Sequence, residues 1–409
     1  MNSIVDRFLK YIAIDTMSNE NSKNSPSTTG QLDLAKSLKY ELESIGITDV
    51  YLDEKGYVYA TIPSNIEKNV PVVGFLSHLD TSPDMSGKEI KPKVLKNYNG
   101  RDIILNEELN IVLSNKEFPE LLNYKNQTLI TTDGTTLLGA DDKAGIAEII
   151  TACEYIIKNN IKHGEIKIAF TPDEEIGKGV DLIDFKRFNA DFAYTIDGGE
   201  IGSLEYETFN AANITVIVKG KNIHPGYAKN KMKNSILIAY ELQSMLPDME
   251  RPENTEGYEG YFHLNSINGN VEETKLYYLI RDHDRDSFEE RKKKLKKYIK
   301  FLNDKYGKNT VKANIKDVYY NMKDKILSRK YVIEYAKQSM KECNINPKIL
   351  PIRGGTDGAK LSYKGLPCPN IFTGGHNAHG KYEYIPVESM IKAVEVIVKI
   401  VELVSEKNN

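Results

Sequence analysis

The sequence predicts an α/β protein: an α/β/α sandwich with a mostly parallel sheet, plus a smaller inserted domain of βαββαβ order. Two observations lead to this class. Apolar runs typical of buried strands, such as 70–79 and 192–196, alternate with segments of helical period, such as 143–158. Between residues 209 and 319 the pattern changes to strand, helix, two strands, helix and strand. The chain has 409 residues, which is more than one hydrophobic core usually serves, so we expect two domains.

The larger domain begins with two segments of helical spacing, 4–14 and 30–45, separated by a loop rich in Ser and Asn. Residues 50–61 are typical of a hairpin, and the almost wholly apolar run 70–79 is typical of a central strand covered on both faces. The elements expected after it are helix 143–158, strands 165–170 and 192–196, helix 330–343, strand 370–373 and helix 386–404.

The inserted domain is expected at 209–319, between two parts of the larger domain at 1–208 and 320–409. Its elements are expected at strand 214–218, helix 231–245, strands 260–267 and 274–281, helix 288–306 and strand 311–318. This order is that of a ferredoxin-like split βαβ unit.

Composition excludes several classes of function. The 55 basic and 58 acidic residues leave a net charge of −3 and are intermixed, which argues against a nucleic-acid partner. Asp6, Arg7 and Lys10 interrupt the N-terminal apolar pattern, so it does not resemble a signal peptide, and no apolar run is long enough to cross a bilayer. We expect a cytoplasmic protein without a membrane partner, whose three cysteines are packing residues.

Acidic and histidine residues follow several of the predicted strands. His78 and Asp80 close the run 70–79, Asp197 ends the strand 192–196, and His379 lies beyond the strand 370–373. Glu174 and Glu175 follow strand 165–170, and Asp141 lies where a tight turn opens helix 143–158. Ligands gather beyond the carboxyl ends of parallel strands, so we expect these side chains to meet in one cleft.

Two histidines and three carboxylates suit a pair of zinc ions, because zinc binds imidazole nitrogen and carboxylate oxygen and two ions can share a carboxylate. Each residue alone has a simpler interpretation. His78 could be a core histidine, Asp197 a turn residue, and Glu174, Glu175 or Asp142 a helix cap. Their coincidence at strand ends predicts a two-zinc hydrolase.

Four segments carry a family resemblance: 77–81 (SHLDT), 138–145 (LGADDKAG), 171–175 (TPDEE) and 375–380 (GHNAHG). They resemble the di-zinc exopeptidase family that includes aminoacylases and glutamate carboxypeptidases, and its tripeptide aminopeptidase branch in particular. The resemblance covers nearly the full length. It implies a zinc-dependent aminopeptidase with two zinc ions per subunit, acting on short peptides, chiefly tripeptides.

The resemblance also implies roles for single residues. His78 and Asp197 are expected to bind one zinc, Glu175 and His379 the other, and Asp141 both. Glu174 is the expected general base, and Asp80 is expected to hold the His78 ring through its free nitrogen. His376, in the loop of His379, is the competing candidate for that ligand.

The inserted domain is expected to act as a lid and to form a homodimer. The resemblance implies that His224 reaches the partner subunit's site and donates a hydrogen bond to the developing oxyanion. Arg281 and Arg353 match positions that could bind the substrate carboxylate.

Two other functions stay open. One is a di-zinc dipeptidase or N-acyl amino acid deacylase, because no acid for the free ammonium of a peptide can be assigned. The other is a zinc-dependent binding protein on the same fold, against which the presence of Glu174 argues. Cobalt or manganese could occupy similar sites.

Overall fold

The computed structural model describes residues 2–406, and the chain divides into two compact units. The larger unit comprises Met1–Tyr206, Asp324–Leu350 and Thr356–Asn409, and the smaller comprises Glu207–Lys323 and Pro351–Gly355. The sequence-based boundaries left the short segment Pro351–Gly355 in the larger domain. It belongs to the smaller unit because Arg353 donates hydrogen bonds to the backbone carbonyls of Gly257 and Glu259, at 2.8 and 3.0 Å.

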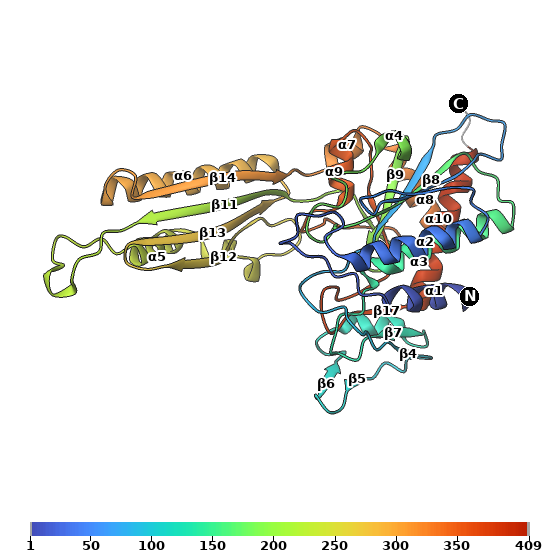
Figure 1. Cartoon of the computed structure of the whole chain (residues 1–409), viewed down its shortest axis with the longest axis horizontal. Helices are drawn as coiled ribbons and strands as arrows, with labels where there is room; N and C mark the ends of the chain where they lie inside the picture. Colours follow the sequence, from blue (N-terminus) through green and yellow to red (C-terminus); the bar gives the residue numbers. More distant parts are fainter. Residues whose placement is uncertain (1, 407–409) are drawn as a thin grey trace. The chain divides into compact units, whose positions relative to one another are not determined.

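An eight-stranded mixed sheet forms the centre of the larger unit, which confirms the predicted α/β class (Figure 1). Its strands are, in spatial order, β1 (Asp49–Leu52), β2 (Val58–Ile62), β8 (Ile166–Thr171), β3 (Val73–His78), β9 (Phe192–Gly198), β16 (Asn370–Phe372), β10 (Ser203–Glu205) and β15 (Lys348–Ile349). The central strands β8, β3, β9 and β16 run parallel, so their carboxyl ends meet at one edge of the sheet.

Helices cover both faces of this sheet. The helices outside the smaller unit's core are α1 (Asn2–Ile12), α2 (Thr29–Ser44), α3 (Ala140–Lys158), α4 (Phe185–Phe188), α7 (Lys323–Leu327), α8 (Tyr331–Glu342), α9 (Asp357–Tyr363) and α10 (Val387–Glu406), and some of them, such as α1, pack against other helices. Strand β3 is buried throughout: Ser77 bonds to Asp142 of α3, whereas Leu76 packs in one cluster with residues of α4 and α9. No helix within residues 2–406 is both long and apolar enough to span a membrane.

Two small sheets beside the main one were not predicted from the sequence. One has the order β17 (Tyr384–Pro386), β7 (Leu129–Thr131), β4 (Lys93–Leu95), and the other pairs β5 (Ile103–Asn106) with β6 (Ile111–Leu113). Each strand has only three or four residues, too few for a period-two pattern to emerge. A short 3₁₀ helix, η1 (Pro119–Tyr124), packs with them.

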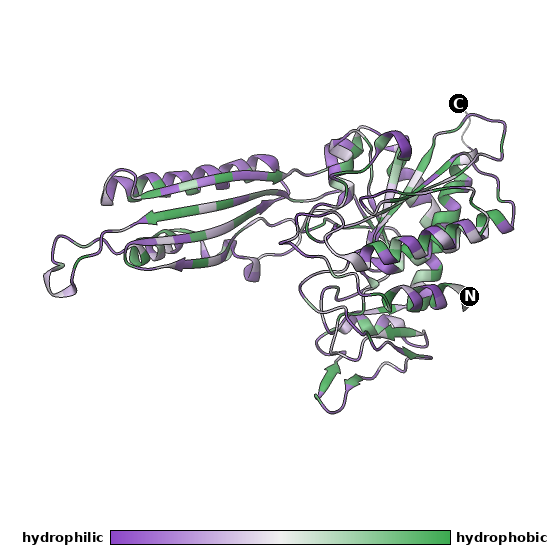
Figure 2. Ribbon diagram, in the orientation of Figure 1, coloured by the Kyte–Doolittle hydropathy of each residue, from purple (hydrophilic) through white to green (hydrophobic). Residues whose placement is uncertain are grey.

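The smaller unit has the predicted βαββαβ order. Its elements are β11 (Asn210–Lys219), η2 (Pro225–Tyr227), α5 (Ser235–Met245), η3 (Asp248–Glu250), η4 (Pro252–Asn254), β12 (Tyr261–Gly269), β13 (Glu273–Asp282), α6 (Arg285–Tyr306) and β14 (Val311–Tyr319). The strands form one antiparallel sheet in the order β12, β13, β11, β14. Hydrophilic and hydrophobic residues alternate along α6 (Figure 2), and Phe288, Leu295 and Leu302 of this helix lie in the core.

Gly145 allows α3 to lie close to strand β9. A Cβ atom at this position would lie 2.0 Å from the carbonyl oxygen of Ile196 and 2.9 Å from the Ser77 hydroxyl. The close approach brings the first turn of α3, which carries Asp141, near the end of β9, which carries Asp197.

We predict that Gly145→Ala destabilises the protein by about 1–3 kcal/mol, because the added methyl group must displace backbone atoms. Helix propensity alone predicts the opposite sign, since Ala is favoured over Gly inside a helix by about 1 kcal/mol. Urea denaturation followed by circular dichroism measures the difference. Gly375→Ala is the matched control, because the nearest atom to its added Cβ would be the Thr373 hydroxyl at 3.5 Å. Equal or greater stability of the Gly145→Ala protein would contradict the packing argument.

Candidate metal centre

The five predicted ligand residues lie together at the carboxyl edge of the main sheet. His78 is the last residue of β3, Asp197 lies near the end of β9, and Asp141 lies in the first turn of α3. Glu175 follows β8 and His379 follows β16 in the loops at the same edge. They form two clusters of possible metal ligands, and Asp141 belongs to both.

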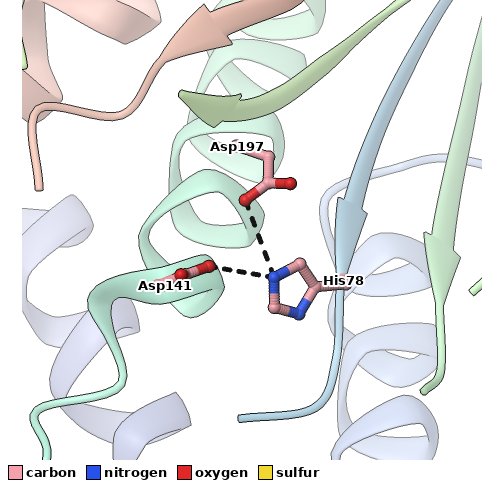
Figure 3. A group of neighbouring side chains, drawn as sticks. All are labelled: His78, Asp141 and Asp197. Carbon is pink, nitrogen blue, oxygen red and sulfur yellow. Dashed lines mark hydrogen bonds and ion pairs between the residues drawn. The ribbon is translucent and has the colours of Figure 1, made fainter. Parts of the chain in front are cut away.

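In the first cluster the His78 ring faces two carboxylates (Figure 3). Its Nε2 atom lies 2.9 Å from Asp141 Oδ1 and 3.6 Å from Asp197 Oδ1. On the other side of the ring, Nδ1 lies 2.9 Å from the backbone carbonyl oxygen of Asp80. If Nδ1 carries the ring proton, it donates a hydrogen bond to that carbonyl. The lone pair of Nε2 then points toward the two carboxylates, which is the orientation that a metal-binding histidine needs.

The second cluster has the same composition, one imidazole and two carboxylates. His379 Nε2 lies 3.2 Å from Asp141 Oδ2 and 3.0 Å from Glu175 Oε2. The two oxygens of Asp141 therefore face different histidines, which is the arrangement of a carboxylate shared between two cations.

The donor atoms fit zinc. Each cluster offers three nitrogen or oxygen ligands, the number that a catalytic zinc usually takes from protein while leaving a position for water. The second carboxylate oxygen of Glu175, Oε1, is buried and has no hydrogen-bond partner among the described residues. A buried carboxylate oxygen without a donor is costly unless a cation is near, so this atom supports a metal at the second cluster.

The crowding of buried acids shifts their pKa values. Burial raises the pKa of Asp197 to about 6, and burial together with Asp141 raises the pKa of Glu175 to about 7. Hydrogen bonds that the His379 ring donates to Asp141 and Glu175 raise its pKa to about 11. Although burial alone would raise it, hydrogen bonds with His379 and His78 hold the pKa of Asp141 below its ordinary value. Protons on the histidines thus supply the positive charge that metal ions would otherwise bring.

Glu174, the predicted general base, is placed beside this centre by the backbone. Burial raises the pKa of its carboxyl group well above the ordinary value, and the charges of Asp357, Asp197 and Glu175 add to the rise. Proton transfer at neutral pH is fastest for a group whose pKa lies near 7, so the direction of this shift suits a general base.

Asp80 holds the backbone under Glu174 and Glu175 as well as the His78 ring. Its carboxylate accepts hydrogen bonds from the backbone N–H groups of Glu174 and Glu175, at 2.9 and 3.1 Å. The predicted contact with His78 exists, but the nearer atom to Nδ1 is the backbone oxygen of Asp80 at 2.9 Å, and the carboxylate is 3.4 Å away. Asp80 is fully buried and belongs to neither cluster of possible ligands.

Sequence reasoning missed three acids around the centre. Asp84 Oδ2 lies 3.3 Å from the Nδ1 atom of His379. Glu383 accepts hydrogen bonds from the loop that carries Asp141. Asp357, at the start of α9, accepts a hydrogen bond from Thr171, the last residue of β8. The signal for Asp84 and Glu383 was their closeness in sequence to the predicted ligands His78 and His379.

His376 lies outside both clusters. Its Nε2 atom is 2.7 Å from the Tyr124 hydroxyl, and its ring stacks on Tyr384 with centroids 4.7 Å apart. Burial lowers its pKa to about 4. The His376 ring therefore packs against aromatic residues beside η1. The His379 ring instead contacts the carboxylates of Asp141 and Glu175, as a metal ligand would.

The three predicted substrate-binding residues belong to the smaller unit. His224 is exposed, and its Nδ1 atom accepts a hydrogen bond from the Gly226 N–H at 3.2 Å, so Nε2 carries the proton. Arg281 donates from Nη1 to the carbonyls of Ala212 and Ile280. Arg353 donates from both Nη atoms to backbone carbonyls of the loop 255–259 and to the Thr255 hydroxyl.

The chain is similar in sequence to known peptidases. The family described as peptidase dimerisation domain matches residues 206–310. Peptidase T of Caldanaerobacter subterraneus subsp. tengcongensis is 58% identical over 408 residues, which is 100% of both chains.

Three solved structures share the fold. The aminopeptidase PepT of Bacillus cereus has a TM-score of 0.79 at 23% identity, and a tripeptidase of Staphylococcus aureus has 0.80 at 22%; in both pairs 99% of each chain is covered. A dinuclear metal binding peptidase of the M20 family from Bacillus subtilis has a TM-score of 0.65 at 12% identity, covering 100% of this chain and 99% of the other.

We predict that zinc binding to the metal-free protein releases protons at about pH 7. The acids raise the pKa values of His78 and His379, so both imidazoles carry protons that a metal must displace, and the apparent affinity should rise as pH increases from about 6 to 9. Calorimetric titration in two buffers of different ionisation enthalpy measures the release. His379→Gln should release fewer protons than wild type, and His163→Gln should not differ, because its ring bonds to the Gly164 carbonyl instead. A binding heat that does not depend on the buffer would contradict the prediction.

Proposed function

The chain belongs to the peptidase T family, and from this premise we propose that it is a zinc-dependent aminopeptidase that releases the N-terminal residue from short peptides, chiefly tripeptides. The names of the aminopeptidase and the tripeptidase that share its fold support this substrate class. The observation that carries the proposal is the Asp141 carboxylate, whose two oxygens each face a histidine. Glu174 interacts electrostatically with His78, Asp197 and Glu175 of the same centre.

Two zinc ions per subunit are proposed. His78 and Asp197 would hold one ion, Glu175 and His379 the other, and Asp141 both, in agreement with the two clusters. The M20 peptidase from Bacillus subtilis is named for a dinuclear metal site and shares the fold. Cobalt or manganese could occupy the same nitrogen and oxygen ligands, so metal content decides the identity of the ions.

In the proposed mechanism the metal ions that these residues would hold would supply Lewis acidity at the scissile carbonyl and would lower the pKa of a water molecule to near 7. Glu174 accepts a proton from the attacking water and then passes it to the departing amine. Asp80 keeps Glu174 in place through its backbone N–H, and the same carboxylate holds the N–H of Glu175.

A homodimer is part of the proposal. The match to the peptidase dimerisation domain supports it, as does helix α5, which exposes Ile236, Leu237 and Tyr240 by 40, 64 and 71%. In such a dimer His224 would donate from Nε2 to the carbonyl oxygen in the partner subunit's site as that oxygen becomes anionic. The Gly226 N–H supports this role because it fixes the proton on Nε2.

Binding of the substrate carboxylate is proposed for Arg281 and Arg353. Arg281 is the stronger candidate of the two, because the hydrogen bonds that it donates to the protein come from Nη1, whereas Arg353 donates from both Nη atoms.

A cytoplasmic location is also proposed. The three cysteines are free thiols in the interior, which is typical of proteins from a reducing compartment.

We predict that Glu174→Gln lowers kcat by about 100- to 10,000-fold, because the amide cannot accept the proton of water. Zinc content should stay at the wild-type value, since Glu174 is in neither ligand cluster. Tripeptide hydrolysis assays measure kcat, and atomic emission spectrometry measures the zinc content. Undiminished turnover would remove Glu174 from its proposed role.

Acetylation of a tripeptide's amino group should lower kcat/KM by at least about 100-fold, because a site that pairs with an ammonium rejects its neutral acyl form. The assay compares trialanine with acetyl-trialanine on the same zinc-loaded protein. A deacylase would prefer the acetylated compound and a dipeptidase would prefer dialanine. Equal rates on free and acetylated tripeptide would overturn the aminopeptidase proposal.

A further inference from the structure

The Glu383 side chain is a buried carboxylate that hydrogen-bonds to the backbone of the Asp141 loop. Its exposed fraction is 1%. Oε2 accepts the N–H groups of Leu138 and Gly139, at 2.6 and 2.8 Å, and Oε1 accepts the N–H of Asp141 itself at 3.1 Å. These N–H groups lie at the start of α3, where a helix supplies no acceptors of its own. Glu383 therefore fixes the backbone on both sides of the left-handed Gly139, at φ 78°.

The backbone of Glu383 is itself held within the loop that carries His379. Glu383 follows His379 by four residues, and two backbone hydrogen bonds between His376 and Tyr384, at 2.9 and 3.1 Å, close the loop. Strand β17 begins at the next residue and pairs with β7. The Glu383 carboxylate thus connects the loop of a ligand in the second cluster to the loop of the shared ligand.

The Lys143 side chain is buried near this carboxylate, and burial lowers its pKa to about 7. Lys143 is fully buried, donates to the Ile14 carbonyl at 2.7 Å, and has Asp15, Glu383 and Asp80 as its main electrostatic partners. Asp80 and Glu383, which are far apart in the sequence, both accept backbone N–H groups of predicted ligand residues, those of Glu175 and Asp141. The three backbone N–H donors satisfy the oxygens of this buried carboxylate.

We propose that Glu383 is a positioning residue that holds Asp141 in place before metal arrives, so that the two carboxylate oxygens face two metal sites. The inference rests on the proposed function, because it needs metal ions at the two clusters. A carboxylate is required since both oxygens must accept N–H groups. A glutamine would turn an N–H donor of its own toward one of those backbone donors and lose at least one of the three bonds.

The test compares Glu383→Gln with the matched variant Glu388→Gln. Glu388 is also a carboxylate that accepts a backbone N–H with both oxygens, that of Thr128 at 3.1 and 2.9 Å, but Thr128 precedes β7 and carries no ligand. Glu383→Gln should weaken zinc binding by about 10- to 100-fold in calorimetry and lower kcat with little change in KM. Glu388→Gln should stay within about twofold of wild type in both quantities.

Wild-type zinc affinity in a folded Glu383→Gln protein would overturn the proposal. So would an equal loss of affinity in the Glu388→Gln protein, because the effect would then be one of general stability.

Hydrogen exchange of the unaltered protein decides the matter if Glu383→Gln fails to fold. The amides of Leu138, Gly139 and Asp141 should be protected in the metal-free protein as well as in the zinc-loaded protein. Fast exchange without zinc and protection only after zinc is added would show that the metal orders the loop, and would overturn the proposal. Neither zinc affinity nor exchange depends on peptide turnover, so a failure of the aminopeptidase proposal would be seen separately.

Discussion

The position of one carboxylate, that of Asp141, is the constraint on which the centre depends. One of its oxygens lies 2.9 Å from the His78 imidazole and the other 3.2 Å from that of His379. Asp197 and Glu175 stand on either side with pKa values raised by burial. Such a concentration of acids is unfavourable without positive charge, and two dications shared through Asp141 would satisfy the acids in both clusters.

The fold explains how residues so far apart in sequence reach this arrangement. Parallel strands β8, β3 and β9 end at one edge of the sheet, so the residues that follow them are neighbours. Gly145 lets α3 approach β9 closely enough for Asp141 and Asp197 to face the same imidazole. Buried carboxylates then hold the connecting backbone, Asp80 at Glu174 and Glu383 at Asp141. The ligand geometry is thus built by a rigid sheet edge and completed by hydrogen bonds to loops.

Helices and strands were recognisable from the sequence where the run of residues that predicts them is long. The apolar run that ends at His78 is long and buried on both faces, so the strand and the charged residue at its end were both recognisable. The βαββαβ order of the smaller unit was recognisable for the same reason, because its helices and strands are long. Strands β4 to β7 and β17 are too short to carry a pattern and were missed.

The roles of Glu383 and Asp84 depend on contacts that the sequence alone does not reveal. Glu383 bonds to backbone amides more than 240 residues away, and the only local hint was its place four residues after His379. The role of Asp80 was predicted through its carboxylate, but the backbone oxygen is the nearer contact to His78.

Anomalous X-ray scattering from crystals of the zinc-loaded protein tests the shared role of Asp141 most directly. Two zinc peaks about 3.5–4 Å apart, one beside each histidine and each bound by a different oxygen of Asp141, are the expected result. A single peak, or two peaks of which one does not contact Asp141, would contradict it.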